Sequence, residues 1–345
     1  MASEFDLIKA YFEPLSIGLP DRDIGIGDDG AVLTPPEKKQ IVVVTDTLVS
    51  GVHFPEESSP YDIAWKALAV NLSDLAAMGA TPGFFSLALT LPDNNTNWLC
   101  EFSRGLADLA KEYSIPLIGG DTTKGPLAVT ITANGWVSKG QAILRSTAKL
   151  GDKIFVTNTL GDGALGLKLA LNTWPDNLQG LFNEEEKQYL LAALNRPKPQ
   201  LSMVPLLQEF ASSAIDISDG FRADLAHILE RTNKTNSHSK PVSAMVELQQ
   251  LPLSKSMQKY LKATDDWSLV LAGGDDYQLC FTVAENQTKA LLLKAQQLGL
   301  KLKDCGFIYQ QVGPVASVDA HPKAQVNLTL ADQPYEKNTK GYLHF

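Results

Sequence analysis

Lys66–Gly79 reads KALAVNLSDLAAMG and decides the first half of the fold. It forms most of a helix that we expect over residues 60–78, because apolar side chains recur there at helical spacing and Gly79 suits a C-terminal cap. Asn71 and Asp74 are three positions apart, so they share one face of this helix. The stretch therefore predicts a helix that carries two oxygen-bearing side chains toward a common site.

Other oxygen-rich segments that contain aspartate recur on both sides of this helix, as expected loops between apolar runs. They are Gly27–Gly30, Thr45–Thr47, Gly119–Thr122, Asp216–Gly220 and Gly273–Asp276. Several of these aspartates directly follow apolar runs, so we expect their carboxylates at the inner ends of strands, where an unpaired negative charge is costly. Turn or helix-cap chemistry explains any single segment equally well. The whole set favours Mg2+, which prefers one or two carboxylates, water and substrate phosphate oxygens.

Strand and helix patterns alternate along the chain and predict a mixed α/β (α+β) fold. Strands are expected near 41–45, 84–91, 115–118, 127–138, 153–157, 213–217, 242–247 and 277–283, and helices near 3–13, 97–112, 163–172, 201–210, 221–232, 254–262 and 285–298. The Gly119–Asp121 segment reads as a turn after its strand. A length of 345 residues suits two domains, with a boundary near Lys149–Lys153.

Composition narrows the class of partner. The formal charge of -9 argues against a nucleic-acid binder, which needs a basic face, and favours small-molecule partners. No apolar run reaches the roughly 20 residues of a membrane span, so we expect neither a membrane anchor nor export. Cys100, Cys280 and Cys305 are isolated and lie in apolar surroundings, so we expect them in the core of a cytoplasmic protein.

The common phosphate-binding signatures are missing. The chain has no Gly-x-x-x-x-Gly-Lys-Ser/Thr loop and no kinase-type His-Arg-Asp or Asp-Phe-Gly element. Gly161-x-Gly163-x-x-Gly166 matches the dinucleotide fingerprint, but Glu184, its acidic partner by position, falls in a polar segment, so we favour a tight strand-to-helix turn. If the protein handles ATP, aspartate-bound magnesium must replace much of what a P-loop supplies.

Single polar residues leave two interpretations open. Taken alone, His53 is more easily explained as a bridge between backbone groups than as a ligand for an anionic substrate. Lys124 and Arg145 flank the acidic region in sequence. Each is either an ordinary surface charge or a fixed cation that binds a polyphosphate. Tyr342 either stacks on a flat heterocycle or anchors the chain end.

Taken together, the segments resemble the thiamine-monophosphate kinase family of the aminoimidazole-ribonucleotide-synthetase-like superfamily. The resemblance covers nearly the whole chain and rests on Gly25–Asp29, Thr45–Val49, Lys66–Gly79, Gly119–Thr123, Asp216–Gly220 and Lys340–Tyr342. It implies an N-terminal sheet domain over 1–149 that binds ATP and magnesium and dimerises. It also implies a C-terminal α/β sandwich domain over 150–345 that completes the nucleotide and substrate site.

The resemblance implies ATP-dependent phosphorylation of thiamine monophosphate to thiamine diphosphate by a homodimer. Magnesium positions are matched by Asp29, Thr45, Asp46, Asp74, Asp121, Asp216 and Asp219. ATP contacts are matched by Tyr113, Gly120, Asp121, Arg145 and Ser218, and substrate contacts by His53, Asp275 and Tyr342. We expect direct in-line transfer without a phospho-enzyme, with several magnesium ions and with Asp46 and Asp74 as the most critical side chains.

Some positions depart from the family pattern. Asp275 replaces a glutamate, so the carboxylate that faces the substrate is one methylene shorter. Thr147 and Leu150 replace a glycine and a proline in the loop that carries Arg145, which leaves the conformation of that loop open. Thr339 occupies a position that is aromatic in some relatives, so stacking on thiamine is expected to rest more on Tyr342.

Rival functions predict features that differ from this chain. Selenophosphate synthetase places a reactive cysteine or selenocysteine near an N-terminal glycine-rich loop, and the hydrogenase-maturation relative ends in cysteine, whereas this chain ends at Phe345 and has its first cysteine at Cys100. Aminoimidazole ribonucleotide synthetase is a closer rival, although the Asn71–Gly79 context and the Lys340–Tyr342 ending favour the kinase. A non-catalytic magnesium or nucleotide sensor is the alternative from another class.

Overall fold

The chain folds into two compact units, and each contains one sheet. The computed structural model describes residues 4–16, 18–20, 22–175, 178–235, 241–311 and 325–336. The first unit comprises Met1–Ala76, Ala80–Ala142 and Asn195–Leu201, and the second comprises Ala77–Gly79, Ile143–Leu194 and Ser202–Phe345. The predicted mixed α/β class is confirmed. The functional division expected at residues 149 and 150 stays a prediction.

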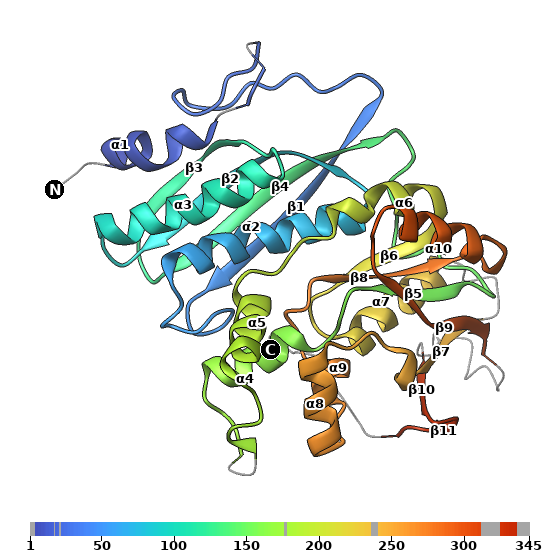
Figure 1. Ribbon diagram of the computed structural model, residues 1–345. Coiled ribbons are helices and arrows are strands. Elements are labelled where there is room, and N and C mark those ends of the chain that lie inside the picture. The colour runs from blue at the N-terminus through green and yellow to red at the C-terminus, as the bar shows by residue number, and fades with distance from the viewer. Residues whose placement is uncertain are drawn as a thin grey trace. The chain divides into compact units, whose positions relative to one another are not determined.

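The first unit is a four-stranded sheet with two long helices on one face (Figure 1). The strands are β1 (Lys39–Val49), β2 (Thr81–Leu91), β3 (Leu117–Lys124) and β4 (Ala128–Ser138), in the order β1-β4-β2-β3. Antiparallel pairs join β4 to β1 and β2, whereas β2 and β3 are parallel. Helices α2 (Pro60–Ala77) and α3 (Thr96–Glu112) make the crossovers between parallel strands. Short helices at Glu4–Leu7 (α1), Ile8–Phe12 and Glu13–Ser16 precede the sheet.

Burial explains which faces of these elements meet. Phe85, Leu87 and Leu89 alternate along β2 and are buried, as strand geometry requires for the face that packs against the helices. Helix α2 is apolar almost all round, which is typical of a helix enclosed in a core. Helix α3 is amphipathic, and the Asn95 side chain caps its start by accepting from the backbone N–H of Asn97 and of Trp98.

The second unit is a seven-stranded sheet in the order β11-β10-β7-β9-β5-β8-β6. Its strands are β5 (Lys153–Thr157), β6 (Ala211–Ile217), β7 (Val242–Glu247), β8 (Gln278–Val283), β9 (Leu302–Gln310), β10 (Val326–Leu330) and β11 (Gln333–Pro334). Its helices are α4 (Asp162–Ala170), α5 (Glu184–Asn195), α6 (Val204–Phe210), α7 (Phe221–Thr235), α8 (Lys255–Thr264), α9 (Ser268–Ala272) and α10 (Thr288–Gln297).

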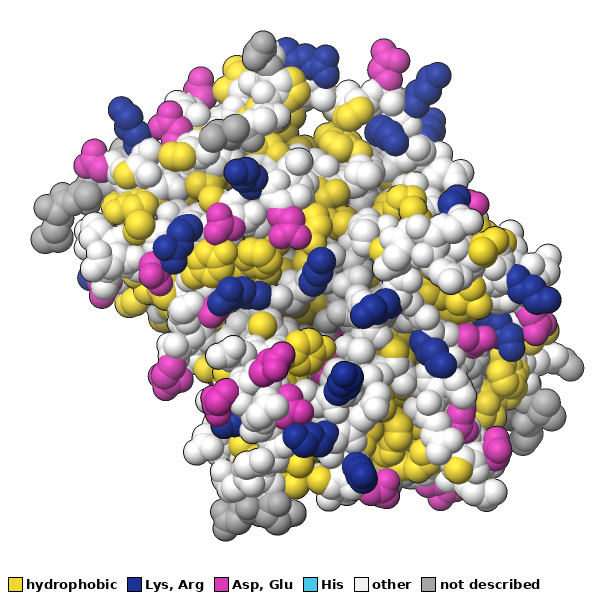
Figure 2. All heavy atoms as spheres, viewed as in Figure 1, with side chains coloured by type: hydrophobic (Ala, Val, Ile, Leu, Met, Phe, Trp, Pro, Cys, Tyr) yellow, Lys and Arg dark blue, Asp and Glu magenta, His cyan; other side chains and the backbone are white. Residues whose placement is uncertain are grey.

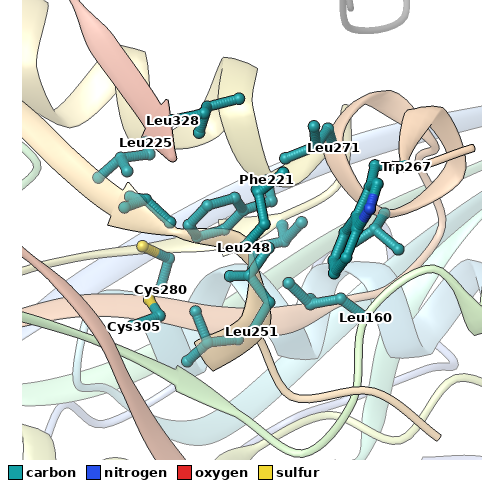
Figure 3. Close-up of a cluster of buried hydrophobic side chains, with 14 of the residues drawn as sticks. Leu160, Phe221, Leu225, Leu248, Leu251, Trp267, Leu271, Cys280, Cys305 and Leu328 are labelled. Atoms are coloured by element: carbon teal, nitrogen blue, oxygen red, sulfur yellow. The ribbon is translucent and has the colours of Figure 1, made fainter. Parts of the chain in front are cut away.

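Both faces of this sheet are packed. On one face, Phe221 and Trp267 pack with leucines from several elements in a cluster that also contains the free thiols of Cys280 and Cys305 (Figure 3). On the other, Phe155 and Phe281 stack with ring centroids 5.7 Å apart. Burial raises the pKa of both thiols, so these two cysteines are inert core residues, as predicted.

Several sequence predictions need correction. Cys100 is exposed on α3, because it faces away from the apolar stripe of that helix. The expected strand at 115–118 begins at Leu117 and runs to Lys124, so Gly119–Asp121 is strand and not turn. Asp46 likewise lies inside β1 and not at its end. The sequence reading also missed α9, β9, β10 and β11.

The outer surface mixes both signs of charge. Lysine and arginine side chains are interspersed with aspartate and glutamate over the face shown in Figure 2. This face therefore differs from the continuous basic surface that binds a nucleic-acid backbone. Among the described residues, no helix has the length and apolar character needed to cross a membrane.

Candidate active site

The first unit contains a cavity of about 650 Å3 between its N-terminal segment and the β2–β3 edge of the sheet. It is lined by Ile8, Lys9, Phe12, Glu13, Ile26–Ala31, Ser86, Leu87 and Leu117–Thr122. Three predicted residues, Asp29, Gly120 and Asp121, therefore share one cavity. Lys9 adds a cation that the sequence reading missed, because a lone lysine in a short amphipathic helix carries no distinctive signal.

The strand pairing explains how Gly120 and Asp121 reach this cavity. β3 pairs in parallel with β2, which places Gly120 opposite Leu87 and Asp121 opposite Ala88. The register shifts between Phe85 and Ser86, so the ladder is irregular just before this point. Such irregularities re-aim the following residues of a strand. Asp121 is consequently exposed at the edge of the sheet, where a charged ligand can approach it.

The acidic segment before β1 forms another wall of the cavity. Asp28 and Asp29 are both exposed, and the Asp28 carboxylate accepts from the backbone N–H of Asp29 at 3.0 Å. Bridges between Ile24 and Val32 hold the base of this segment as a narrow turn. The two carboxylates and Asp121 thus converge on one cavity although about 90 residues separate them in sequence.

Thr45 and Asp46 leave the sheet on opposite faces. The Thr45 hydroxyl lies 2.9 Å from that of Thr132 on the exposed face of the sheet. Asp46 lies on the other face, with buried Val42 and Leu48, because side chains alternate along a strand. A cation held by the Asp46 carboxylate could therefore reach Thr45 only through its main-chain carbonyl.

Asn71 and Asp74 differ in environment although they share a helix face. Asn71 is fully buried and donates to the Ala67 carbonyl at 3.0 Å, while Asp74 is half-buried. The Asn71 side-chain oxygen is buried without a hydrogen-bond partner. A buried acceptor without a donor is unfavourable, and a cation-bound water would satisfy it.

His53 is tied to the backbone of its own loop. Its Nδ1 accepts from the Val49 N–H at 3.1 Å. The buried ammonium of Lys66 donates to the His53 carbonyl at 3.2 Å. Lys66 was not predicted as a functional residue, although a lysine within an apolar helix is a recognisable signal because lysine is rarely buried.

Tyr113 lies at the C-terminus of α3 and is not among the residues that line the cavity. Its hydroxyl donates to the Pro199 carbonyl at 3.3 Å, and burial raises its pKa. Trp65 makes a similar contact, donating to the Pro197 carbonyl at 3.3 Å. The two aromatic residues hold segment 195–201 on the first unit. The ATP contact expected of Tyr113 stays a prediction.

In the second unit, three carboxylates gather where β6 turns into α7. Asp216 is the penultimate residue of β6, and Asp219 lies in the turn. Asp224 accepts from the backbone N–H of Ser218 at 3.0 Å and of Asp219 at 3.1 Å. Burial, followed by the charges of Asp216 and Asp219, raises the pKa of Asp224 to about 8. The predicted residues therefore share a negatively charged turn. Asp224 was missed, although an acidic residue in the first turn of a helix is a known signal.

Asp275 lies next to this turn in the fold. Its backbone N–H donates to the Ser218 carbonyl at 3.1 Å. The next residue, Asp276, is buried and accepts from the Gly161 N–H through both carboxylate oxygens, at 2.9 and 2.8 Å. The Asp276 side chain thus caps the start of α4. The Gly161-x-Gly163-x-x-Gly166 segment is a packing turn, as favoured from sequence: the Gly161 N–H is bonded to Asp276, and β-carbons on Gly163 and Gly166 would each lie 2.2 Å from a backbone oxygen.

Removing the Asp276 cap should destabilise the second unit. Asp276→Ala leaves the backbone N–H of Gly161 buried without an acceptor, for an expected loss of about 2 kcal/mol in the free energy of unfolding. Urea denaturation followed by circular dichroism measures this loss. Asp276→Asn keeps one acceptor and should lose about half as much. Wild-type stability of Asp276→Ala would contradict the capping role.

The loop that carries Arg145 is fixed within the second unit. The Thr147 hydroxyl lies 2.6 Å from the Ser212 carbonyl and 2.9 Å from that of Leu144. Asp152, which is buried, accepts from the Lys149 N–H at 2.9 Å. Thr147 therefore anchors this loop by hydrogen bonding. Arg145 itself is exposed, and Lys124 is exposed at the end of β3. Tyr342 and Thr339 lie outside the described residues.

The carboxylate groups described above fit a cation that takes some of its ligands from the protein and the others from water and substrate. Among the residues that the structure describes, no three Asp, Glu, His or Cys side chains already stand close enough to hold a metal ion alone. Carboxylates instead occur in small groups, at the cavity of the first unit and at the β6–α7 turn of the second. Mg2+ keeps several waters and shares phosphate oxygens with its substrate, so such groups suit it.

Comparison with known proteins gives the family. The family model for the N-terminal domain of AIR synthase related proteins matches residues 27–137 of this chain. Thiamine-monophosphate kinase of Escherichia coli (strain K12) is 40% identical over 342 residues, which cover 99% of this chain and 98% of the relative. The chain belongs to the thiamine-monophosphate kinase family. The predicted enzyme class and its activity, ATP-dependent phosphorylation of thiamine monophosphate, are thereby confirmed.

Solved thiamine-monophosphate kinase structures share the fold. The crystal structure of the enzyme from Stenotrophomonas maltophilia K279a is 40% identical, covers 96% of this chain and 98% of its own, and superimposes with a TM-score of 0.80. The structure of AaThiL complexed with AMPPCP and TMP is 27% identical, covers 99% of this chain and 97% of its own, and has a TM-score of 0.73. The architecture predicted for the superfamily is therefore confirmed.

Proposed function

We propose that this kinase transfers the γ-phosphoryl group of ATP directly to a phosphate oxygen of thiamine monophosphate. A new phosphorus–oxygen bond forms to the acceptor phosphate as the bond between the β–γ bridging oxygen and the γ-phosphorus breaks, which yields thiamine diphosphate and ADP. The acceptor phosphate has a second pKa near 6 and is largely ionised at neutral pH, so no strong base is needed. His53 is accordingly given a binding role and not a basic one.

The observation that carries this proposal is the cavity where Gly120 and Asp121 meet Asp28 and Asp29. Phosphoryl transfer depends mainly on positioning and charge neutralisation. Gly120 on β3 is part of the lining of this cavity, and Lys9 adds a cation to it. The AaThiL complex with AMPPCP and TMP, a fold relative over nearly the full chain, supports two phosphorylated ligands for this fold.

The remaining contacts are carried over from the family resemblance. We assign Tyr113, Gly120, Asp121, Arg145 and Ser218 to ATP, and His53, Asp275 and Tyr342 to thiamine monophosphate. Magnesium would be held by Asp29, Thr45, Asp46, Asp74, Asp121, Asp216 and Asp219. When bound, it supplies positive charge that offsets the phosphates and carboxylates and aligns donor with acceptor. The protein side chains fix these ions and keep the acceptor in line.

A mass-spectrometric assay tests the reaction. Protein, ATP, Mg2+ and thiamine monophosphate should yield thiamine diphosphate, and chelation of the metal should abolish it. Incubation with ATP labelled in its γ-phosphate but without thiamine monophosphate should leave the protein unlabelled. A phosphorylated protein that passes its label to thiamine monophosphate would contradict direct transfer. Tight binding of magnesium alone in titration calorimetry, without turnover, would favour the sensor.

The open face of the four-stranded sheet supports a homodimer. Ile41 and Val43 are 50% and 58% exposed on β1, and they lie on the face opposite α2 and α3. Trp136 pairs with Ile41 on that face, and its ring lies 5.9 Å from that of Phe84. An apolar patch of this kind on a sheet is typical of an interface between subunits. We infer that a second copy of the chain covers it.

A charge on this patch should separate the subunits. Val43→Lys places an ammonium group at the centre of the proposed interface, so sedimentation velocity should show a monomer where the wild type sediments as a dimer. Leu293→Lys is the matched control, because Leu293 is 59% exposed but belongs to the second unit. A dimeric Val43→Lys protein would contradict the assignment of this surface.

We infer a reducing, cytoplasmic location from the cysteines. Cys280 and Cys305 are both buried and free, and the Cys305 thiol donates to the Ile154 carbonyl. Thiols that persist side by side in a core suit a compartment that does not form disulfides. Thiamine-monophosphate kinase activity in a cytosolic fraction, lost with a deletion of this gene, tests the location.

A further inference from the structure

The loop Gly273–Tyr277, between α9 and β8, adopts a strained backbone. Asp275 has a φ of +67° and Tyr277 a φ of +49°, although neither is glycine. Residues with a β-carbon pay a steric penalty in this region, and they keep it only where surrounding structure imposes it. Two such residues around Asp276 therefore point to a loop whose shape is set by its contacts.

Those contacts join the loop to the β6–α7 turn. The backbone N–H of Asp275 donates to the Ser218 carbonyl at 3.1 Å, and the backbone N–H of Tyr277 donates to the Ile217 carbonyl at 2.8 Å. A β-carbon on Gly274 would lie 2.4 Å from the Ser218 carbonyl oxygen, so the two backbones touch. Asp276 fixes the other side of the loop at Gly161. The loop is thus held from both sides.

The strained conformation brings two side chains together. The Tyr277 hydroxyl donates to a carboxylate oxygen of Asp275 at 3.1 Å. Tyr277 is buried, with 9% of its surface exposed, while Asp275 is half-buried. A ring fixed by packing holds its hydroxyl in place, and the hydroxyl in turn fixes the orientation of the carboxylate.

We propose that Tyr277 is a positioning residue for the substrate: its hydroxyl orients the Asp275 carboxylate toward the cationic thiazolium ring of thiamine monophosphate. This inference rests on the substrate contact proposed for Asp275. A carboxylate attracts a permanent cation most strongly at short distance and in a dry site. Because aspartate is one methylene shorter than the glutamate of the family pattern, it has less reach, and its orientation matters more.

Tyr277→Phe tests the proposal, because it removes one oxygen and keeps the buried ring. The KM for thiamine monophosphate should rise about fivefold, on the scale of the net contribution of one typical hydrogen bond. The KM for ATP and kcat should stay within about twofold of wild type. Tyr260→Phe is the matched control, since Tyr260 is also buried and donates to a carboxylate, that of Asp266, at 3.2 Å. It should leave both KM values unchanged.

A double-mutant cycle separates positioning from a purely structural role. Asp275→Asn should raise the KM for thiamine monophosphate, and Tyr277→Phe should add little in that background because the carboxylate is already gone. If Asp275→Asn leaves this KM unchanged, the substrate contact is wrong and the inference fails with it. If Asp275→Asn raises it but Tyr277→Phe does not, the contact stands and the positioning role is wrong. Additive effects, or equal rises in both KM values, would also overturn the positioning role.

Discussion

Asp46→Asn should lower kcat at least about 100-fold while the protein stays folded. Removing one electrostatic group that acts on the transferred charge commonly lowers the rate about 100- to 1000-fold. Asparagine has nearly the same shape but no negative charge, so it holds a divalent cation weakly. The strand itself should tolerate the change, because β1 pairs with β4 along its full length from Lys39 to Val49.

The measurement is initial-rate kinetics at saturating ATP and thiamine monophosphate over a wide range of magnesium concentrations. Asp74→Asn, on the half-buried face of α2, should behave in the same way. Asp108→Asn is the matched control, because Asp108 is exposed on α3, accepts from the Tyr61 hydroxyl at 2.9 Å and is not among the predicted metal-binding residues. Its kcat should stay within about twofold of wild type. Near-normal turnover of Asp46→Asn and Asp74→Asn at saturating magnesium would exclude the metal role of both residues.

The sequence was most informative where local pattern and tertiary packing agree. Helix α2 was predicted nearly to the residue, since its apolar composition, Pro60 and Gly79 all favour the same limits. The pair Gly119–Gly120 was misread as a turn, because two adjacent glycines usually mark one. In the structure these glycines lie in β3, where Gly120 permits close approach of β2.

Long-range contacts account for most of what the sequence left open. β9 carries Lys303 and Asp304 among its apolar residues, so its pattern did not suggest a strand inside a seven-stranded sheet. The cap of α4 by Asp276 joins residues 115 positions apart, and no local rule indicates it. The acidic segments were recognisable because each is compact. Their division between the two units could not be read from spacing alone.

Gly120→Ala should destabilise the first unit by about 3 kcal/mol, the upper part of the range for overpacking. A β-carbon at Gly120 would lie 1.8 Å from the Leu87 carbonyl oxygen and 2.7 Å from its carbon, both in the backbone of β2. These atoms cannot rotate away as a side chain could, so β2 and β3 must separate. The irregular register near Phe85 and Ser86 turns this position toward its neighbour.

Gly119→Ala is a control one residue away. Its β-carbon would meet no atom within 4 Å, so the same addition in the same strand should change the free energy of unfolding by less than about 0.5 kcal/mol. Urea denaturation followed by tryptophan fluorescence compares the two variants, and Trp136 on β4 reports on this sheet. Equal midpoints for Gly120→Ala and Gly119→Ala would show that β2 and β3 do not need this close approach. A large difference would mean that Gly120 is required by the sheet itself, so that a loss of activity in Gly120→Ala alone could not be assigned to an ATP contact.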